Sequence, residues 1–385
     1  MAPRHMPTTD FTDAPTFSRP IWAEVDLAAL RSNFETLAAL GPGNMLAVVK
    51  ANAYGHGAAA SARALMEGPV RPAMLAVASV DEGLQLRDAG VTAPILLLSA
   101  ILPAEARDAV RAGLTPTVFT AEVAAALDAA GRAEGRVAEA HFKIDTGMAR
   151  LGAPTEEAAG LWKSFRAFPN LRIGGVYTHF ACADEEDDPM SVGQVSAFRE
   201  FLDECGIRSG EVLVHAANSA AQLRYPEARF APARCGISLY GALPSAFSNP
   251  FGVALRPVMS LRARVTHVRT VRAGTSISYG ATWRAARDSR IATVPAGYAD
   301  GYPRSLSNRG QVLVRGQRCP VVGRVTMDIT LVDITELGAG VGLGEAVTLF
   351  GSGLLAEEVA AWAGTIPYEI FTGVAARVPR VYSRG

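Results

Sequence analysis

The stretch MLAVVK, residues 45–50, is a continuous apolar run that ends in a lysine. Runs of this length suit strands that are buried on both faces, as in a parallel sheet. Similar runs follow at residues 73–78, 95–98, 115–119, 140–144, 173–177 and 212–214, with a weaker one at 237–240. Segments between them, such as 121–131 and 191–205, have helical spacing, and Asp26 is placed to cap a helix that ends at Gly41. Eight strands alternating with helices predict an α/β fold with a (β/α)8, TIM-type barrel.

The barrel prediction has one rival and a C-terminal limit. An open doubly wound sheet often carries a glycine-rich phosphate motif after its first strand, but neither GxGxxG nor GxxxxGK[ST] occurs here. After about residue 250, β-branched residues alternate between glycines, and only 354–363 has helical spacing. We therefore expect the barrel over residues 20–248 and a mainly-β domain over 249–385. Residues 1–19 contain no apolar run and are expected to form a disordered lead-in.

Composition restricts the classes of function. Lys plus Arg number 37 and Asp plus Glu also number 37, so the basic excess of a dedicated nucleic-acid binder is missing. The apolar share of 49% excludes disorder as the main state, and no run of about 18 apolar residues predicts a membrane span. Zero net charge gives little protection against self-association, so we expect an oligomer. The cysteines at 182, 205, 235 and 319 are expected to be free thiols in a reducing, cytoplasmic compartment.

Lys50 is the first residue whose position suggests chemistry. A lysine that closes a buried strand loses hydration, which favours the neutral amine. A neutral amine can form a Schiff base, either with pyridoxal phosphate or with a ketone substrate. The alternative is a lysine that extends to solvent at the barrel rim. Tyr54 follows among small residues that allow a ligand close to the backbone, and it could donate a hydrogen bond to a phosphate, whereas His56 could simply pack the next helix.

Nine motifs in order resemble the alanine racemase family, whose members are fold-type III pyridoxal-phosphate enzymes. The first is the cofactor-lysine motif AVVKANAYGHG at 47–57. The others are KIDTGMARLG at 143–152, GVYTHFACADE at 175–185, HAANSAA at 215–221, ARCGISLYG at 233–241, SISYGATW at 276–283, VPAGYADGYPR at 294–304, VVGRVTMDIT at 321–330 and IPYEIFTGVAARVPR at 366–380. The resemblance covers about residues 20 to 383. It implies a pyridoxal 5′-phosphate enzyme that interconverts L-alanine and D-alanine for peptidoglycan, acting as a homodimer on a small amino-acid substrate.

The resemblance also implies roles for single residues. Lys50 matches the lysine that carries the cofactor and acts as one acid–base group, and Tyr279 matches the second, supplied by the other subunit. Cofactor-binding positions are matched by Tyr54, His179, Ser219, Arg234, Gly236, Ile237 and Tyr368. Arg150 and the backbone of Met327 match the groups that hold the substrate carboxylate. Lys143 matches a lysine that is often carbamylated, and entrance positions are matched by Asp184, His215, Tyr298, Arg304 and Arg324.

These roles make chemical sense for racemisation. A proton must leave one face of Cα and another must return to the opposite face, so two bases on opposite sides are economical. An arginine stays protonated, so Arg234 beside the pyridine nitrogen would keep that nitrogen unprotonated and limit side reactions such as transamination. Without the resemblance, the favoured interpretation of Arg234 is a rim arginine paired with Glu227 or Asp184, because surface ion pairs are common. Tyrosine has an ordinary pKa of about 10, so Tyr279 needs nearby positive charge, for which Arg150 is a candidate.

Two positions depart from the family pattern. One acidic segment also raises the question of a metal site. Thr326 stands where many members have cysteine, and Ala149 replaces a frequent glycine before Arg150. The acidic run 184–188 is expected to be solvated, and we predict no metal site because no His, Cys or Glu cluster has ligand spacing.

Other functions remain as alternatives. A racemase of broader specificity, for serine and alanine, fits the same motifs. A pyridoxal-phosphate carrier resembles the barrel alone, and the roughly 130 residues after Pro250 argue against it. A fold-type III decarboxylase tends to place an acidic residue at the pyridine nitrogen, and a Schiff-base aldolase explains neither Tyr54 nor the second domain.

Overall fold

The structure is a computed structural model that describes residues 19–41, 45–208 and 210–383. The expected lead-in, residues 1–19, therefore falls outside the described residues except for Arg19. The guanidinium of Arg19 forms an ion pair with the carboxylate of Asp300. Within the described ranges no helix is long and apolar enough to cross a membrane.

Eight parallel strands form a closed barrel, which confirms the predicted (β/α)8 architecture. They are β2 (Met45–Val48), β3 (Met74–Val77), β4 (Ile95–Leu97), β5 (Thr117–Val118), β6 (Ala138–Asp145), β8 (Leu171–Tyr177), β9 (Leu213–His215) and β10 (Ala233–Cys235). They run in two series, β10-β2-β3-β4 and β5-β6-β8-β9, with the short β7 (Ala153–Pro154) added to β6. A parallel bridge between Leu96 and Thr115 joins the series on one side. On the other side, the Arg234 amide donates to the Ala217 carbonyl at 2.8 Å.

The eighth strand lies slightly earlier than the sequence predicted. Residues 237–240 were expected to form it, but Ile237–Tyr240 is a 3-10 helix, η3. Gly236, whose ψ is −94°, turns the chain out of the extended conformation directly after β10. The apolar run therefore predicted correctly that residues 237–240 are buried, but it did not predict their 3-10 conformation.

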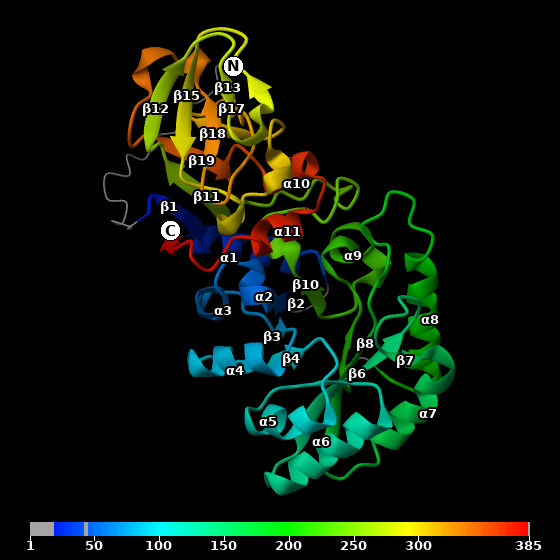
Figure 1. Cartoon of the computed structure of the whole chain (residues 1–385). Helices are drawn as coiled ribbons and strands as arrows, with labels where there is room; N and C mark the ends of the chain where they lie inside the picture. The colour runs from blue at the N-terminus through cyan, green and yellow to red at the C-terminus, as the bar shows by residue number, and fades with distance from the viewer. Residues whose placement is uncertain (1–18, 42–44, 209, 384–385) are drawn as a thin grey trace.

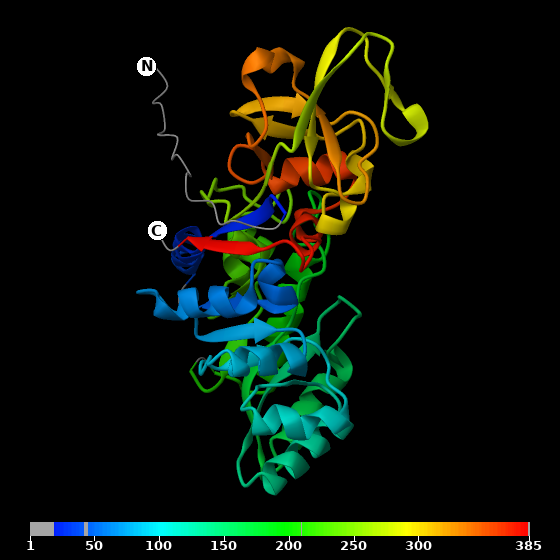
Figure 2. The ribbon, with the colours of Figure 1, turned by 60° about the vertical axis from the view of Figure 1, so that its left-hand side comes forward.

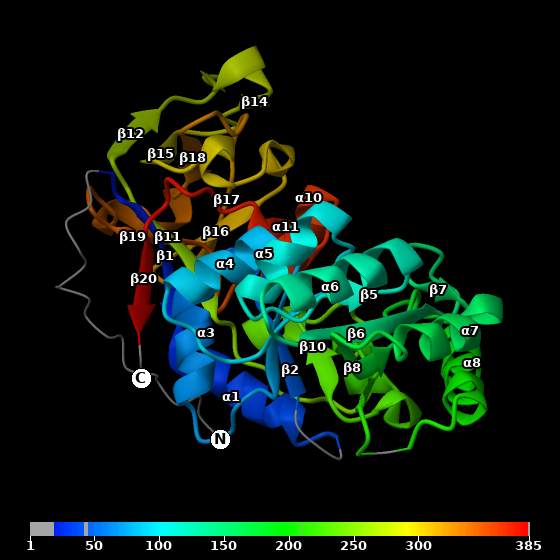
Figure 3. The same cartoon turned by 90° about the horizontal axis from the view of Figure 1, so that it is seen from below.

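Helices surround the barrel and connect its strands (Figure 3). They are α1 (Leu27–Ala38), α2 (Lys50–Tyr54), α3 (Ala58–Glu67), α4 (Val80–Asp88), α5 (Ala106–Arg111), α6 (Ala121–Ala133), α7 (Thr155–Phe165), α8 (Ser191–Glu204) and α9 (Ser219–Arg224). Asp26 caps α1 as predicted, since its carboxylate accepts from the Ala29 amide at 2.8 Å. Phe142 of β6 packs outward on these helices, with its ring centroid 5.8 Å from those of Trp162 and Phe165. Its neighbours His141 and Lys143 therefore point into the barrel, because side chains alternate along a strand.

The second part of the chain is built from mainly antiparallel strands above the barrel, with β20 parallel to β1 (Figures 1 and 2). Its strands are β11 (Met259–Arg264), β12 (His267–Val271), β13 (Ser276–Ile277), β14 (Trp283–Arg284), β15 (Ser289–Val294), β16 (Gln311–Val314), β17 (Gln317–Pro320), β18 (Thr330–Asp333), β19 (Ala346–Phe350) and β20 (Arg380–Ser383). A six-stranded sheet has the order β17-β16-β19-β11-β1-β20, and β12-β15-β18 form a second sheet. The hairpin β13–β14 projects from this part of the molecule (Figures 2 and 3).

Two features of this part correct the sequence-based expectation. Strand β1 (Ile21–Asp26) falls in the range expected to form the barrel, but it pairs with β11 and β20 in the six-stranded sheet. Helix α10 (Ala356–Ala363) was predicted, whereas α11 (Pro367–Thr372) was missed. Helix α11 packs against α2, so the C-terminal segment returns to the barrel. This return places Tyr368 beside α2, which begins at Lys50, and we call α2 the lysine turn.

Candidate active site

A cavity of about 360 Å³ opens at the carboxyl ends of the barrel strands, which is where barrel enzymes place their chemistry. Most of the predicted site residues line it, namely Lys50, Tyr54, Lys143, Arg150, His179, Asp184, Ser219, Arg234, Gly236, Ile237 and Tyr368. The predicted residues that do not line it are His215, Tyr279, Tyr298, Arg304, Arg324 and Met327. Cationic side chains outnumber acidic ones along its wall, so the cavity suits an anionic ligand.

Lys50 begins a turn of unusual backbone conformation. Ala51, Asn52, Ala53 and Tyr54 have φ angles of 51°, 54°, 55° and 51°, so α2 is a left-handed turn of four residues that are not glycine. Each such residue costs about 1–2 kcal/mol, and strain of this kind persists only where surrounding contacts determine it. Here Glu82 accepts from the Ala51 amide at 2.7 Å, and the ring Nδ1 of buried His56 lies 3.0 Å from both the Ala53 and Tyr54 carbonyl oxygens.

The surroundings of Lys50 favour the neutral form of its amine. Burial lowers its pKa, the positive charge of Arg150 lowers it further, and Glu82 opposes the shift. A lowered pKa increases the fraction of neutral amine, which is the nucleophilic form that makes a Schiff base.

Four groups converge on a small cradle beside this turn. A Cβ added to Gly236 would lie 2.3 Å from the Tyr54 hydroxyl, so only glycine leaves room there. The Gly236 amide donates to Ser219 Oγ at 2.9 Å, and the Tyr54 and Tyr368 rings lie 5.9 Å apart. Burial raises the pKa of both tyrosines, so their hydroxyls stay protonated and can donate hydrogen bonds. Hydroxyls grouped in this way beside an open glycine backbone fit the phosphate of pyridoxal phosphate.

Arg234 is buried beneath the cavity and is held by several acceptors. Its guanidinium donates to the carbonyl oxygens of Thr178 at 2.7 Å and Ala216 at 2.9 Å. It also lies 2.9 Å from His215 Nδ1 and 3.1 Å from His179 Nδ1. Its side chain pairs with neither Glu227 nor Asp184, so the alternative of a rim ion pair is wrong. Burial lowers its pKa to about 10, which leaves it protonated at neutral pH.

His215 was predicted at the cavity entrance, and the structure corrects this position. The residue is fully buried at the end of β9, behind Arg234. Its ring stacks on Tyr177 with centroids 4.7 Å apart. Burial and the charge of Arg234 hold the pKa of His215 well below its ordinary value, so it is a neutral support for Arg234 and not a polar group at the mouth.

Lys143 lies in the cavity wall without a carboxylate partner among the described residues. Its Nζ sits over the Tyr177 ring at 5.5 Å from the centroid. Burial, helped by the charges of Arg234 and Arg150, lowers its pKa to about 8. Asp145 is occupied elsewhere, because its carboxylate accepts from the amides of Gly147 and Met148 at 2.9 and 2.8 Å. These bonds form the turn that carries Arg150 into the cavity.

Tyr279 and Met327 lie on the β domain and are open to solvent. Their exposed fractions are 73% and 53%. Tyr279 begins a 3-10 turn, η4 (Tyr279–Ala281), between β13 and β14, and Ser278 Oγ anchors this turn by donating to the Arg324 carbonyl at 2.8 Å. Neither side chain contacts the cavity of its own chain.

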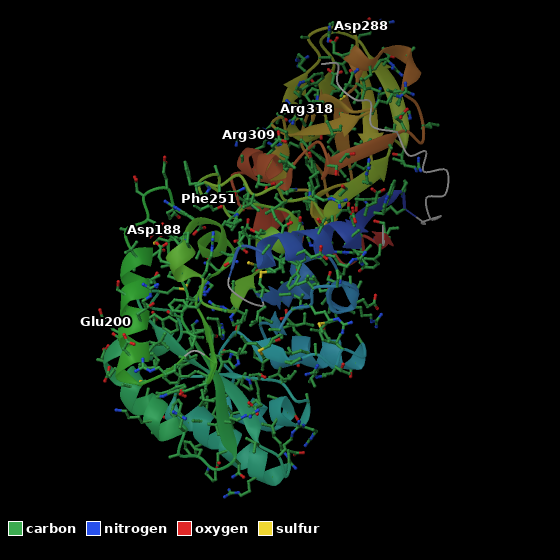
Figure 4. All side chains as sticks on the ribbon, turned by 180° about the vertical axis from the view of Figure 1, so that it is seen from behind. Asp188, Glu200, Phe251, Asp288, Arg309 and Arg318 are labelled. Atoms are coloured by element: carbon green, nitrogen blue, oxygen red, sulfur yellow. The ribbon has the colours of Figure 1, made fainter. Side chains whose placement is uncertain are left out.

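The acidic run 184–188 does not form a metal centre. Asp188 accepts from the amides of Met190 and Ser191, each at 2.9 Å, just before and at the start of α8, and it lies at the outer surface (Figure 4). Asp184 alone of this run lines the cavity. Across the described part of the chain, no group of three His, Cys, Asp or Glu side chains could hold a metal ion.

Two family models match the chain almost end to end. The alanine racemase N-terminal domain matches residues 25–244, and the alanine racemase C-terminal domain matches residues 258–382. The chain belongs to the alanine racemase family. The alanine racemase of Desulforamulus reducens is 45% identical over 94% of this chain and 99% of its own length. The family resemblance expected from the motifs is therefore confirmed.

Solved alanine racemases have the same fold. The Clostridium difficile 630 enzyme superposes with a TM-score of 0.90 at 35% identity, covering 96% of this chain and 97% of that one. The Bartonella henselae alanine racemase, solved with covalently bound pyridoxal phosphate, gives a TM-score of 0.85 at 31% identity over 94% of this chain and 99% of that one.

Several residues that support the alanine racemase site were not predicted from the sequence. Glu82 holds the lysine turn, Tyr177 lies under Arg234 and Lys143, and His141 contacts His215. One signal was available for His141, since it stands two residues before Lys143 on a buried strand and must share its face. Glu82 gave no such signal, because its partner lies 31 residues earlier in the chain.

Proposed function

We propose that this chain interconverts L-alanine and D-alanine with pyridoxal phosphate attached to Lys50. The observation that carries the proposal is that a lysine with a lowered pKa and a buried, protonated arginine face one cavity in a member of the alanine racemase family. The covalently bound pyridoxal phosphate of the Bartonella henselae neighbour supports the cofactor. When bound, the cofactor withdraws electrons from Cα of the amino acid and so acidifies its proton.

Arg234 sets the electronic character of that withdrawal. Its guanidinium is protonated at neutral pH, and it donates hydrogen bonds to the buried carbonyl oxygens of Thr178 and Ala216. A cation that donates toward the pyridine nitrogen keeps this nitrogen unprotonated, which moderates the electron withdrawal. Moderate withdrawal favours return of the proton to Cα over transamination.

Two bases would move the protons. Lys50 is suited to one face of Cα, because its amine loses charge readily. We assign the opposite face to Tyr279 of the partner subunit, since the Tyr279 hydroxyl is exposed on a projecting hairpin and does not reach the cavity of its own chain. A homodimer with shared sites follows from this assignment.

The other cavity residues would bind and orient. Arg150 and the Met327 amide would hold the substrate carboxylate, with Lys143 carbamylated to supply an anion beside Arg150. The phosphate would lie on Tyr54, Ser219, Gly236, Ile237 and Tyr368, and His179 would pack on the ring. Asp184, Tyr298, Arg304 and Arg324 remain proposed entrance residues. D-Alanine points to peptidoglycan synthesis, and four free cysteines support a cytoplasmic location.

Reductive trapping tests the cofactor assignment. The chain has only three lysines, Lys50, Lys143 and Lys163, so borohydride reduction of the loaded protein followed by peptide mapping gives an unambiguous answer. We expect the pyridoxyl adduct on Lys50. An adduct on Lys143 or Lys163 alone would overturn the assignment.

A panel of L-amino acids tests the reaction and its breadth. Each is incubated with the loaded protein, and the D-isomer is measured by chiral chromatography together with released CO2. We expect D-alanine from L-alanine, and comparable D-serine would indicate the broader racemase. Release of CO2 from lysine, ornithine or diaminopimelate, or bound cofactor without turnover, would contradict the proposal in favour of a decarboxylase or a carrier.

A further inference from the structure

A second cavity opens at the opposite, amino-terminal end of the barrel strands. Its volume is about 780 Å³, and its wall includes His141, Glu139, Arg172 and Glu211. We call it the basal cavity. His141 forms part of its lining although the residue is only 3% exposed. No described residue partners His141 Nε2.

Three buried side chains connect the basal cavity to the active-site cavity through the barrel. His141 Nδ1 lies 2.9 Å from His215 Nε2. His215 Nδ1 in turn lies 2.9 Å from a guanidinium nitrogen of Arg234, and Arg234 lines the active-site cavity. Each contact is within hydrogen-bond distance.

The direction of every hydrogen bond in this series follows from Arg234. A guanidinium only donates, so His215 Nδ1 must accept and carry no proton. A neutral His215 then has its proton on Nε2, which donates to His141 Nδ1. His141 must also carry its proton on Nε2, which is the nitrogen without a protein partner. Burial and the charge of Arg234 keep the pKa of both histidines low, to about 3 for His141, so both rings are neutral.

Packing leaves these rings little freedom to turn. A Cβ on Gly175 would lie 2.6–2.7 Å from three atoms of the His141 ring, so the missing side chain makes room for it. The His215 ring lies flat on Tyr177, with 9° between the planes. The Tyr177 hydroxyl is fixed by Thr117 Oγ1 at 2.7 Å.

We propose that His141 is a positioning residue for Arg234 and acts through His215 from the far end of the barrel. His141 Nδ1 accepts a hydrogen bond from the Nε2–H of His215, which fixes the tautomer that presents a bare Nδ1 to the guanidinium. Arg234 thereby keeps one orientation toward the cofactor ring. The effect on catalysis rests on the proposed racemase function, whereas the tautomers do not.

The tautomers are measured first, on protein without cofactor. Histidine is labelled with 15N, and two-bond 1H–15N correlations report which ring nitrogen carries the proton. We expect the Nε2–H tautomer at His141 and His215. His56 is the internal control with the opposite tautomer, because its Nδ1 contacts two carbonyl oxygens and must donate. An Nδ1–H tautomer or a charged ring at His141 or His215 at neutral pH would refute the proposal.

Two substitutions at His141 separate the hydrogen bond from mere packing. His141→Leu removes the acceptor, and His141→Asn keeps one, since Asn Oδ1 occupies the place of Nδ1. We expect His141→Leu to disturb the His215 tautomer, shift the visible absorption of bound cofactor and lower kcat about tenfold, the size of one hydrogen bond, with KM little changed. His141→Asn should leave the His215 tautomer, the absorption of bound cofactor and kcat close to those of the wild type.

Glu139→Gln is the matched control in the same cavity, because Glu139 pairs with Arg172 and does not touch the histidines. It should leave the tautomers and the absorption unchanged. Equal loss in His141→Leu and His141→Asn would show that only volume matters and would overturn the proposal. If His141→Leu does not fold, the wild-type tautomers and the His141→Asn variant still decide. A chain with the expected tautomers but no racemase activity would refute the proposed function alone.

Discussion

The candidate site has a barrel half, Lys50, Arg234 and the residues around them, and a β-domain half, Tyr279 and Met327. In the barrel half, Arg234 is 3% exposed and donates to two carbonyl oxygens within 3 Å. In the β-domain half, the Tyr279 side chain is 73% exposed. The barrel half is thus organised by its own chain, whereas the β-domain half offers its groups to solvent.

This difference indicates what fixes the position of the functional side chains in each half. Buried charges are stable only when paired or hydrogen-bonded, so the folded barrel itself fixes Arg234. The Tyr279 turn has a fixed backbone, because Ser278 is held by the Arg324 carbonyl and has a φ of 64°. Among the described residues, none gives the Tyr279 side chain such support, and it is 73% exposed. Perturbing the two halves should therefore produce different kinds of defect.

Lys50→Ala should cause the largest effect. One general acid–base group contributes about 10²–10⁴-fold in rate, and Lys50 is proposed both to act as such a group and to attach the cofactor. We expect racemisation to fall below detection and the Schiff-base absorption band to disappear, as measured by a D-alanine assay and a visible spectrum.

Lys163→Ala is the matched control, because Lys163 is exposed on α7. It should keep both the band and the activity. A Schiff-base band that survives in Lys50→Ala would contradict the role of the barrel half.

Tyr279→Phe should cause the next largest effect, about 10²–10⁴-fold in kcat for L-alanine. The hydroxyl is the only atom lost, and no cavity residue changes, so cofactor binding should stay intact. Steady-state kinetics and the cofactor spectrum measure both quantities.

Mixing two defective variants tests whether the halves come from different subunits. In a hybrid dimer of Lys50→Ala and Tyr279→Phe, one site combines the intact Lys50 of one subunit with the intact Tyr279 of the other. Random reassortment by mild unfolding and refolding should therefore restore about a quarter of wild-type activity. Absence of recovery would mean that Tyr279 serves its own subunit or no site at all.

Sequence patterns predicted the strands and cavity residues of the barrel half better than the distant contacts that hold them in place. Seven of the eight strands follow from the apolar runs, and most cavity residues follow from the family motifs, the first of which spans residues 47–57. Strand β1 was misplaced because its partners β11 and β20 lie more than 200 residues away, and such pairing leaves no local signal. The left-handed conformation of Ala51–Tyr54 was missed for a related reason, since Glu82, from another βα unit, makes it possible.

His215 illustrates a different limit. The family resemblance marked it as an entrance residue, but an entrance residue and a buried support look the same in sequence. Only the contacts with Arg234 and His141 decide between them. Burial of a polar residue is a property of the assembled barrel and not of its own strand.

The barrel half should also make stability depend on pH between 5 and 7. His56, His141 and His215 are buried and His179 is half-buried in the cavity wall, and all four have pKa values far below the ordinary 6.5. The unfolded chain therefore binds more protons than the folded chain below pH 6.5, so stability is fully present above that pH and is lost as pH falls. Each histidine should cost about 2 kcal/mol of unfolding free energy by pH 5.

Urea unfolding at several pH values measures this slope. Ordinary carboxylates titrate near 4, so the window from 5 to 7 isolates the histidines. His56→Phe keeps an aromatic ring against Tyr240 and Phe371. It should reduce the slope of unfolding free energy against pH by about the contribution of one histidine. A slope that is unchanged in this variant would mean that His56 does not remain neutral in the folded state.

Ala149→Gly should have the smallest effect, a gain of about 1 kcal/mol or less in unfolding free energy. Ala149 has a φ of 56°, a left-handed conformation that costs an alanine more than a glycine, and it precedes Arg150 in the turn held by Asp145. Glycine's greater entropy in the unfolded chain offsets part of the relief.

Ala125→Gly gives a control of opposite sign. Ala125 is exposed within α6, where glycine costs about 1 kcal/mol relative to alanine. The same substitution should therefore stabilise the Arg150 turn and destabilise the helix, as compared by urea midpoints at constant slope. If both variants lose stability equally, the left-handed turn before Arg150 is not strained, and the barrel half holds Arg150 without backbone cost.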